Sequence, residues 1–516
     1  MPPCPRGALV VALTAGLFAC SGDQELATGP SLAKGGNTPP LAVSPTSVIL
    51  SLTSATQATL TAKAQASGTI NAATSDAACA TVSPANAVAT KPMGSSVYVA
   101  SFTVTPVGTG SCAITLSTTS GAEAQTQVVV SAVELRAQTL VGSDRFTCGL
   151  TASGAAYCWG RNQFGQLGTR KNIGTDDPNP TPAAVSGNLT FVSLTAGWSH
   201  ACGLTSAGAA YCWGANGALG STKRLGPTNV SSTPIAVEGG HKFVALTAGN
   251  AHTCGVTDTG AAYCWGLNYF GQLGNPTNSG VLGVGNPTPL AVSGGQTFVA
   301  IAAGADHTCA LTPLGAAWCW GDNTYLALGN PSISGTVQIN PTPTAVAGGL
   351  TFAALTAGNG TTCGLTDAGA AYCWGTNSSG QLGTAADLGV ARASPEAVSG
   401  GLQFTEIRAG GVQTCGLTSG GVGYCWGSNL FGELGTTTNA GVMPSNNPTP
   451  EAVGGGLTFA TLATGVQHTC GVTVAGAAYC WGENSEGQLG NTTNIGTFEA
   501  NPTPGAVLGG ITFAAP

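Results

Sequence analysis

After the first forty residues, the chain contains many short runs in which apolar and polar positions alternate with a period of two. Between 41 and 133 the alternating runs, such as TQATLTAKAQ and VYVASFTVTPV, are short and are separated by Gly, Pro and Ser. Successive side chains of a strand point to opposite faces, so this pattern indicates strands with one buried face. Several such strands in a stretch of this length predict a small β-sandwich over 41–133.

From residue 134 to residue 516 the alternation recurs as seven copies of one unit. The first of two cysteines in each copy falls at 148, 202, 254, 309, 363, 415 and 470, and the second follows ten positions later. A copy contains four runs, whose commonest forms are F-x-x-L-x-A-G, H-T-C-G-L-T, A-A-Y-C-W-G and P-T-P-x-A-V. A repeat of this length with several short strands indicates a β-propeller. We therefore expect seven four-stranded blades.

The two cysteines of a copy lie on either side of a Thr-x-x-Gly turn. A three-residue loop at 258–260 would place Thr257 opposite Ala261 and Cys254 opposite Cys264, close enough for a disulfide. Free buried thiols and a metal site are the alternatives, although zinc needs four ligands and each copy supplies two cysteines. In the sandwich, Cys79 and Cys112 are expected to bridge two strands. The pairs predicted within the copies are Cys148–Cys158, Cys202–Cys212, Cys254–Cys264, Cys309–Cys319, Cys363–Cys373, Cys415–Cys425 and Cys470–Cys480.

Composition and charge narrow the class of protein. Only 7% of residues are charged, 43% are hydrophobic, and Gly and Pro are abundant at 79 and 29 residues. Such a chain is typical of all-β proteins that have a core, rather than of disordered chains. The net charge of −7 gives no electrostatic basis for binding a nucleic-acid backbone. We expect a monomer that does not bind nucleic acid.

The N-terminus has the features of an export signal. One cation, Arg6, precedes an apolar run over 7–19 that is too short to span a bilayer. The sequence Leu17-Phe18-Ala19-Cys20 resembles a bacterial lipoprotein signal, in which Cys20 would carry the lipid; plain secretion is the alternative. We expect 1–20 to be the signal and 21–40 a flexible tether. The protein would then be exported, in contact with a membrane only through its lipid anchor, at the outer membrane or cell surface, or secreted.

The repeated phrase carries a family resemblance. The run H-T-C-G-[LV]-T-x-x-G-A-A-Y-C-W-G-x-N-x-x-G-Q-L-G is similar to the repeats of the regulator of chromosome condensation family. The segment 41–133 resembles bacterial immunoglobulin-like modules. The resemblance implies an all-β protein in which an immunoglobulin-like sandwich precedes a seven-bladed propeller over 134–516. Within that family some members are guanine-nucleotide exchange factors, and others are secreted inhibitors that cap an enzyme.

Several recurring residues are expected to be structural. One slot contains His200, His252, His307 or His468 in four copies, while the other copies have Phe, Thr or Gln there. This variation predicts a hydrogen-bonding role rather than catalysis. One tryptophan occurs at the same position in each of the seven copies, and these tryptophans are expected to pack between blades. Residues 502–513 are expected to pair with the first blade and close the ring, a frayed tail being the alternative. The tryptophans are Trp159, Trp213, Trp265, Trp320, Trp374, Trp426 and Trp481.

No recognised catalytic, phosphate-binding or calcium-binding motif occurs in the chain, so we expect neither an enzyme nor a cofactor or metal. The remaining enzymatic alternative is an active site assembled from separate blades at the channel mouth. A polysaccharide-cleaving site of that kind would need two carboxylates a few ångströms apart.

The copies differ most in the loop between Gln-Leu-Gly and Pro-Thr-Pro, and repeat proteins often use such loops for binding. An aromatic ring precedes this loop in four copies, and basic residues cluster in the first two copies. Aromatic and basic residues suit a protein partner, although the rings could instead wedge between blades. We expect a non-enzymatic scaffold that binds a protein or surface ligand at the cell envelope. The candidate binding residues are Phe164, Arg170, Lys171, Lys223, Arg224, Phe270, Tyr325 and Phe431.

Overall fold

The computed structural model describes residues 41–44, 47–51, 57–92, 95–107, 110–131, 138–223, 230–334, 339–386 and 388–515. These residues form nine β-sheets and two single-turn 3-10 helices, η1 (Asn216–Ala218) and η2 (Pro331–Ile333). Within the described residues, no helix is long and apolar enough to cross a membrane.

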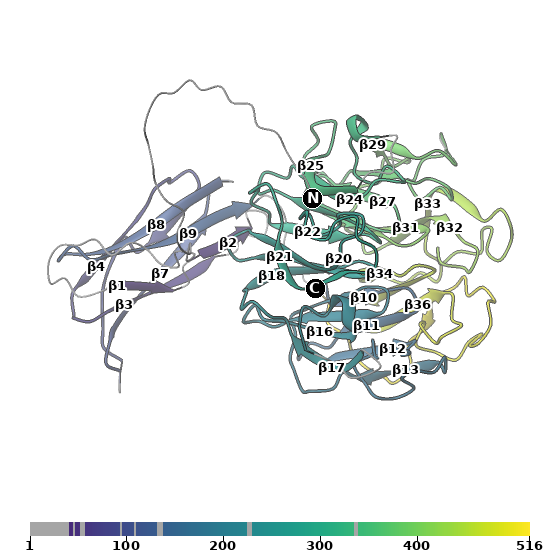
Figure 1. Ribbon diagram of the computed structural model, residues 1–516, viewed down its shortest axis with the longest axis horizontal. Helices are drawn as coiled ribbons and strands as arrows, with labels where there is room; N and C mark the ends of the chain where they lie inside the picture. Colours follow the sequence, from purple (N-terminus) through teal and green to yellow (C-terminus); the bar gives the residue numbers. More distant parts are fainter. Residues whose placement is uncertain are drawn as a thin grey trace, which may run out of the picture. The chain divides into compact units, whose positions relative to one another are not determined.

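The first two sheets pack on one core. One has the order β1-β3-β7-β5 and the other β2-β9-β8-β4-β6. Leu60 and Phe102 of the first sheet lie with Ile114 and Val128 of the second in a single buried cluster, as alternation predicted for a sandwich. The immunoglobulin-like classification stays a prediction. The strands are β1 (Leu41–Ser44), β2 (Ser47–Ser51), β3 (Ala58–Ala64), β4 (Thr69–Thr74), β5 (Ala80–Ser83), β6 (Asn86–Val88), β7 (Tyr98–Pro106), β8 (Gly110–Thr118) and β9 (Glu123–Ser131) (Figure 1).

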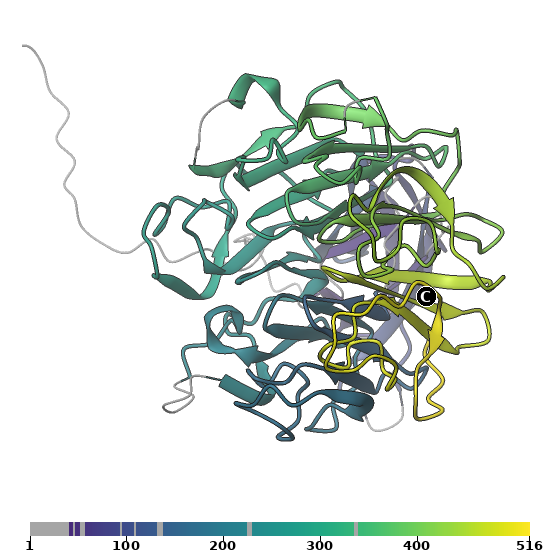
Figure 2. The ribbon, with the colours of Figure 1, turned by 90° about the vertical axis from the view of Figure 1, so that its right-hand side faces the viewer.

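The other seven sheets are the repeat sheets. Each has four antiparallel strands in chain order, one from each of the four runs of a copy. Figure 2 shows them following one another around a common centre. The first three are β10 (Leu140–Gly142), β11 (Phe146–Leu150), β12 (Ala156–Gly160) and β13 (Asn179–Ala184); β14 (Ser193–Ala196), β15 (His200–Leu204), β16 (Ala210–Ala215) and β17 (Val230–Ala236); and β18 (Phe243–Ala248), β19 (His252–Thr257), β20 (Ala262–Leu267) and β21 (Gly285–Ala291). The fourth and fifth are β22 (Ala300–Ala303), β23 (His307–Leu311), β24 (Ala317–Asp322) and β25 (Ile339–Ala345); and β26 (Ala354–Ala357), β27 (Thr361–Leu365), β28 (Ala371–Gly375) and β29 (Arg392–Ala397). The last two are β30 (Glu406–Ala409), β31 (Gln413–Leu417), β32 (Gly423–Ser428) and β33 (Asn446–Ala452); and β34 (Phe459–Thr464), β35 (His468–Thr473), β36 (Ala478–Gly482) and β37 (Gly505–Ala506).

The Thr-x-x-Gly turn sets the register of the two middle strands. The Thr257 N–H donates to the Ala261 carbonyl, and Cys254 lies opposite Cys264 with their Cα atoms 4.0 Å apart. The structure joins this pair, the other six pairs of the repeats, and Cys79 with Cys112. Each repeat bond closes a short loop, which stabilises the fold by about 2.5–3 kcal/mol in the chain-entropy model.

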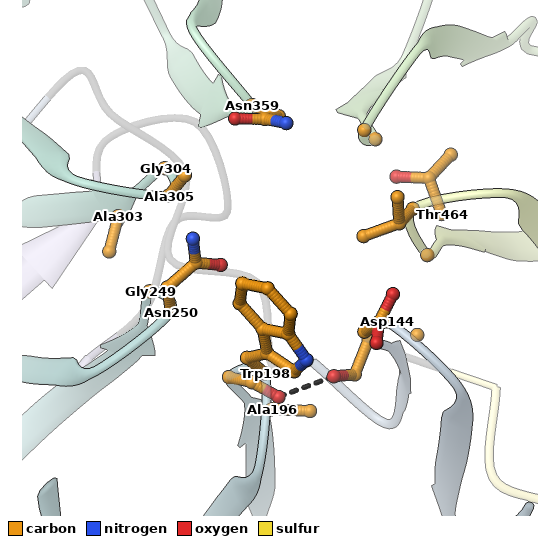
Figure 3. Close-up of a pocket in the computed structure, with 18 of the residues that line it drawn as sticks. Asp144, Ala196, Trp198, Gly249, Asn250, Ala303, Gly304, Ala305, Asn359 and Thr464 are labelled. Carbon is orange, nitrogen blue, oxygen red and sulfur yellow. Dashed lines mark hydrogen bonds between the residues drawn. The ribbon is translucent and has the colours of Figure 1, made fainter. Parts of the chain in front are cut away.

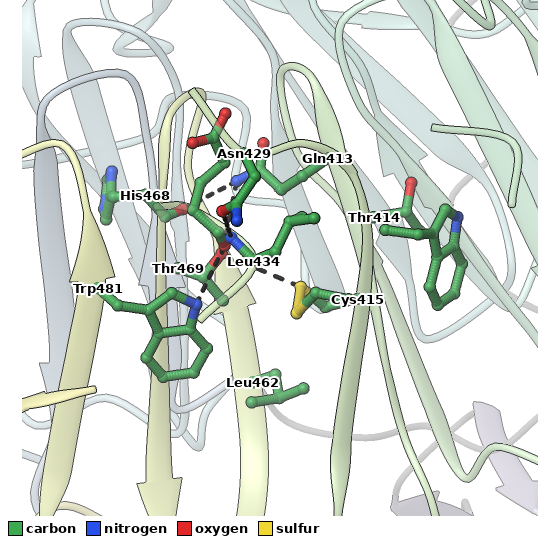
Figure 4. Close-up of a disulfide and its surroundings, with 12 residues drawn as sticks. Gln413, Thr414, Cys415, Asn429, Leu434, Leu462, His468, Thr469 and Trp481 are labelled. Carbon is green, nitrogen blue, oxygen red and sulfur yellow. Dashed lines mark hydrogen bonds between the residues drawn. A yellow bond between two sulfur atoms is a disulfide. The ribbon is translucent and has the colours of Figure 1, made fainter. Parts of the chain in front are cut away.

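Neighbouring repeat sheets are joined through the recurring tryptophan. In Figure 4, the Trp481 indole N–H donates to the Glu433 carbonyl in the preceding repeat, at 3.0 Å. All seven tryptophans are fully buried and make the equivalent bond. Trp159 closes the circle, because its N–H donates to the carbonyl of Gln488 in the last copy at 2.9 Å. The predicted packing between sheets is therefore observed.

The chain end closes the ring in a different way from the one expected. Residues 502–513 were expected to pair with the first repeat. This expectation was wrong for the first part of the segment, because β37 pairs with β36 in the last sheet. The Val507 N–H bonds to the Ala478 carbonyl and holds that segment in its own repeat. The final residues make backbone hydrogen bonds to the first repeat: Phe513 bridges to Thr151, and the Ala514 N–H donates to the Leu150 carbonyl.

Candidate functional site

The shared strand order gives the repeat sheets two different faces. In an antiparallel sheet, the connections from strand one to two and from strand three to four leave at the same end. We call that end of the repeat sheets the loop face. The Ala-Gly-x-x turns lie at its centre, and the long variable loops lie at its rim. We call the opposite end, where the Thr-x-x-Gly turns lie, the turn face.

A ring of glycines surrounds the centre of the loop face, where neighbouring repeats come into backbone contact. A Cβ atom added to Gly410 would lie 2.5 Å from the Gly465 carbonyl oxygen, and that oxygen already accepts the Gly411 N–H at 3.1 Å. No larger residue fits without moving the backbone. The Ala-Gly step that recurs in the sequence is explained by this contact. The glycines are Gly142, Gly197, Gly249, Gly304, Gly358, Gly410 and Gly465.

The glycine ring encloses a cavity of about 180 Å³, the mouth cavity. The side chains of Trp198, Asp144, Asn250 and Asn359 surround its open centre in Figure 3, and Trp198 remains 52% exposed. Among the described residues that line it, Asp144 is the one carboxylate.

Sequence reasoning missed Trp198, because it is outside the fixed phase of the seven packing tryptophans. A signal was nevertheless present in the sequence. At the same position after the glycine, the other copies have small, polar or aliphatic residues. These residues are Ser143, Asn250, Ala305, Asn359, Gly411 and Val466.

Acidic groups around the mouth cavity are partly buried and incompletely neutralised. Burial raises the pKa of Asp144, although Arg145 and Arg161 oppose the rise. The Arg145 guanidinium is shared between two acids, with its Nη1 atom 3.2 Å from Glu486 Oε1 and its Nε atom 3.7 Å from Asp144 Oδ2. Burial also raises the pKa of Glu483.

Across the mouth, burial and the charge of Asp322 raise the pKa of Asp306 to about 6. Asp306 directly follows Ala305, which lines the cavity. Acidic groups with raised pKa values that interact at one cavity, as Asp144 and Glu483 do, are typical of a functional site.

The recurring histidines have the structural role that was predicted. Each histidine Nε2 lies 2.8–3.0 Å from a threonine hydroxyl of the next repeat, as in His252 with Thr308 and His468 with Thr147. Burial lowers the pKa of His252 to about 3 and that of His200 to about 4, so both rings are neutral at pH 7. They tie repeats together and lie beneath the surface.

The four predicted aromatic residues divide into two environments. Tyr325 is 50% exposed, and Phe164 is also exposed, with the Arg161 guanidinium 6.0 Å from its ring centre. Phe270 and Phe431 are half-buried, and their carbonyls accept N–H groups from Asn340 and Asn501 of the next repeat. Phe164 and Tyr325 are therefore the more accessible rings, although Tyr325 also lies against Gly360 of the next repeat.

The predicted basic residues Arg170, Lys171 and Lys223 are exposed on the loops of the first two repeats. Arg224 and Cys20 lie outside the described residues. The structure thus leaves three of the basic side chains accessible on the loop face.

Sequence reasoning also missed a set of exposed apolar side chains at the tips of the long loops. Leu282, Met443 and Phe498 are 80%, 84% and 65% exposed. They belong to the third, sixth and seventh copies, and Val281, Val284, Leu388, Val390 and Val442 accompany them. An apolar residue in an irregular loop has no periodic pattern, so its exposure could not be read from the sequence.

These features define an RCC1-like β-propeller protein. The model of the RCC1-like domain matches residues 107–403, and that of the regulator of chromosome condensation (RCC1) repeat matches 459–488. The chain belongs to the RCC1-like domain family.

Relatives and solved structures agree with this assignment. The chain is 31% identical to the Arabidopsis thaliana ultraviolet-B receptor UVR8 over 349 residues, which is 66% of this chain and 75% of UVR8. It is also 31% identical to the human E3 ubiquitin-protein ligase HERC2 over 363 residues, 68% of this chain but only 7% of HERC2. Saccharomyces cerevisiae Prp20p has a TM-score of 0.59 at 22% identity, with 73% of this chain and 88% of that one covered. Human WBSCR16 has a TM-score of 0.58 at 20% identity, with 71% and 95% covered. At these identities, the two structures support the fold.

Proposed function

We propose that this protein is an exported, non-enzymatic, seven-bladed propeller that binds a protein partner with its loop face. The observation that carries the proposal is the set of exposed apolar loop tips on that face, exemplified by Leu282, Met443 and Phe498. Contact of large apolar side chains with water is unfavourable in free energy, and a partner that covers these side chains removes this cost. Tyr325 and Phe164 add aromatic surface of the kind that dominates binding energies.

What is known of relatives agrees with a binding role. The crystal structure of Prp20p was described together with its binding to Gsp1p and histones, so a propeller of this fold can serve as a protein-binding platform. The chain spans a small part of HERC2, so the ligase activity of that protein is not transferred to this one. Affinity capture distinguishes two kinds of partner: a protein whose nucleotide exchange this chain promotes, and an enzyme that it caps.

Export to the cell envelope is part of the proposal. All sixteen cysteines within the described residues are paired in eight disulfides, which persist in oxidising compartments. The signal-like segment at 1–20 and the lipid acceptor Cys20 complete this part of the proposal.

The polysaccharide-cleaving alternative has less support. It asks for two carboxylates in one cleft. Asp144 is the one carboxylate among the described residues that line the mouth cavity, and the neighbouring Glu483 and Glu486 are buried and do not line it. We therefore favour binding over hydrolysis.

The proposal is tested by affinity capture with the full-length, oxidised protein from envelope extract and culture supernatant. A loop-face variant replaces three exposed tips, Leu282→Ser, Met443→Ser and Phe498→Ser. A matched turn-face variant removes exposed apolar side chains at the opposite end, Leu314→Ser, Val422→Ser and Val474→Ser.

We expect one partner that the native protein and the turn-face variant retain and the loop-face variant loses. Equal loss with both variants would contradict a binding site on the loop face. The absence of any specific partner would contradict the proposed function itself.

A further inference from the structure

The mouth cavity combines an open aromatic face with an acidic group. Trp198 extends into the cavity, and its indole nitrogen points toward Asp144 in Figure 3. With that edge directed at the carboxylate, the 52% exposure of Trp198 leaves part of the residue accessible to a ligand. The negative face of an indole attracts a cation placed over it. A carboxylate next to the ring adds a charged hydrogen-bond acceptor.

The amides around the cavity are also uncommitted. Within the described residues, the side chains of Asn250 and Asn359 make no hydrogen bond to another group, although their backbone N–H groups bond to Ala305 and Gly410. Figure 3 shows both amides at the edge of the open centre. Their side-chain oxygens can accept hydrogen bonds from a donor-rich ligand.

The charges next to the cavity favour a cation over a neutral ligand. The three carboxylates of Asp144, Glu483 and Glu486 outnumber the two guanidinium groups near them. Arg145 contacts Asp144 and Glu486 directly, and Arg161 acts on Asp144 through its charge. Glu486 Oε2 is buried and has no hydrogen-bond partner within the described residues. Arg161 is occupied by Gln163 and Asp176. Burial raises the pKa of both Asp144 and Glu483, and a positive charge in the cavity would relieve this unfavourable burial.

We propose that the mouth cavity binds a guanidinium or alkylammonium group, with the cation over the Trp198 ring and paired with the Asp144 carboxylate. Asn250 and Asn359 accept the remaining hydrogen bonds. This inference rests on the proposed function when the cation is an Arg or Lys side chain of the partner, which would insert at the centre of the loop face. The site can nevertheless be tested without any partner.

The test is calorimetric titration of the full-length, oxidised protein with Nα-acetyl-arginine amide at low ionic strength. Nα-acetyl-citrulline amide, which has nearly the same shape without the charge, is the matched control ligand. The variants are Trp198→Ala, Trp198→Phe and Asp144→Asn, with Leu314→Ala on the turn face as the control variant. Circular dichroism melting shows whether each variant is folded.

We expect saturable one-to-one binding of the arginine derivative and binding of the citrulline derivative at least about tenfold weaker. Trp198→Ala should weaken binding by about tenfold and Trp198→Phe by less, because a smaller ring remains. Asp144→Asn should weaken it at least as much, and Leu314→Ala should leave it unchanged.

Equal binding of the two derivatives, or no saturable binding of either, would overturn the inference. A parallel titration with a methyl glycoside tests for neutral, hydroxylated ligands, and binding of the glycoside in place of the cation would overturn the inference as well. If the probe fails while the loop-face variant still loses a captured partner, the inference about the cation is wrong and the proposed function stands.

Discussion

The glycine ring gives a prediction whose size follows from one contact. In Gly410→Ala, the new Cβ would lie 2.5 Å from the Gly465 carbonyl oxygen, while real Cβ contacts are essentially never below 3.0 Å. The two turns must therefore separate by about 0.5 Å, which strains the bond from the Gly411 N–H to the same oxygen. We expect the free energy of unfolding to fall by about 1–3 kcal/mol, the usual cost of overpacking.

A second glycine provides the control for this prediction. Gly217 is exposed, lies in η1, and has open space where its Cβ would be. Gly217→Ala should therefore be neutral or stabilise the fold by up to about 1 kcal/mol, because alanine restricts the unfolded chain. Urea unfolding of both variants under oxidising conditions measures the difference. A Gly410→Ala protein as stable as Gly217→Ala would refute the reasoning that backbone contact dictates the glycine ring.

Three further predictions concern stability. Replacing both Cys254 and Cys264 by Ala should lower the free energy of unfolding by about 2.5–3 kcal/mol in urea titration, and an unchanged midpoint would show that this bond adds nothing. The pKa of His252 is about 3 in the fold and about 6.5 when unfolded, so the unfolded state binds the proton more readily and stability is lost as pH falls below 6.5. His252→Gln introduces the residue type that the sixth repeat has at this position, Gln413. In this variant the urea midpoint should change less between pH 4 and 7 than in the native protein. The same change in both proteins would show that His252 does not cause the pH dependence of stability. The pKa of Asp306 is raised to about 6, so its ionisation opposes folding as pH rises through 6. Asp306→Asn should stabilise the protein at pH 8 and give no gain at pH 3.5, and equal gains at both would contradict the assignment.

The sequence was sufficient to predict contacts that every copy makes in the same way. The Cys254–Cys264 pairing follows from one turn, and the tryptophan packing follows from a fixed phase. The disulfide and the tryptophan contact both occur in all seven copies, so the recurrence of these residues indicates that they have the same environment in every copy. The strands of a repeat were equally predictable, because their alternation of apolar and polar residues reflects one buried face.

The candidate site was less predictable, because it depends on residues that occur once. Trp198 and Asp144 come from neighbouring repeats and meet only when the first two repeat sheets pack against each other. The aromatic residues before the long loops occupy equivalent sequence positions, yet Tyr325 is open and Phe431 is half-buried against the next repeat. Local pattern could not separate them, since their exposure depends on the length and course of the adjacent loop.

The most direct test of the account is the dissociation constant of the captured partner for the two triple variants. Three large apolar side chains differ between the native protein and each variant, and burying even one of them is worth about 1.5–3 kcal/mol. The account predicts that the loop-face variant with Leu282, Met443 and Phe498 replaced binds at least about tenfold more weakly than the native protein, while the turn-face variant binds as the native protein does. Equal affinities for the two variants would contradict a partner site on the loop face.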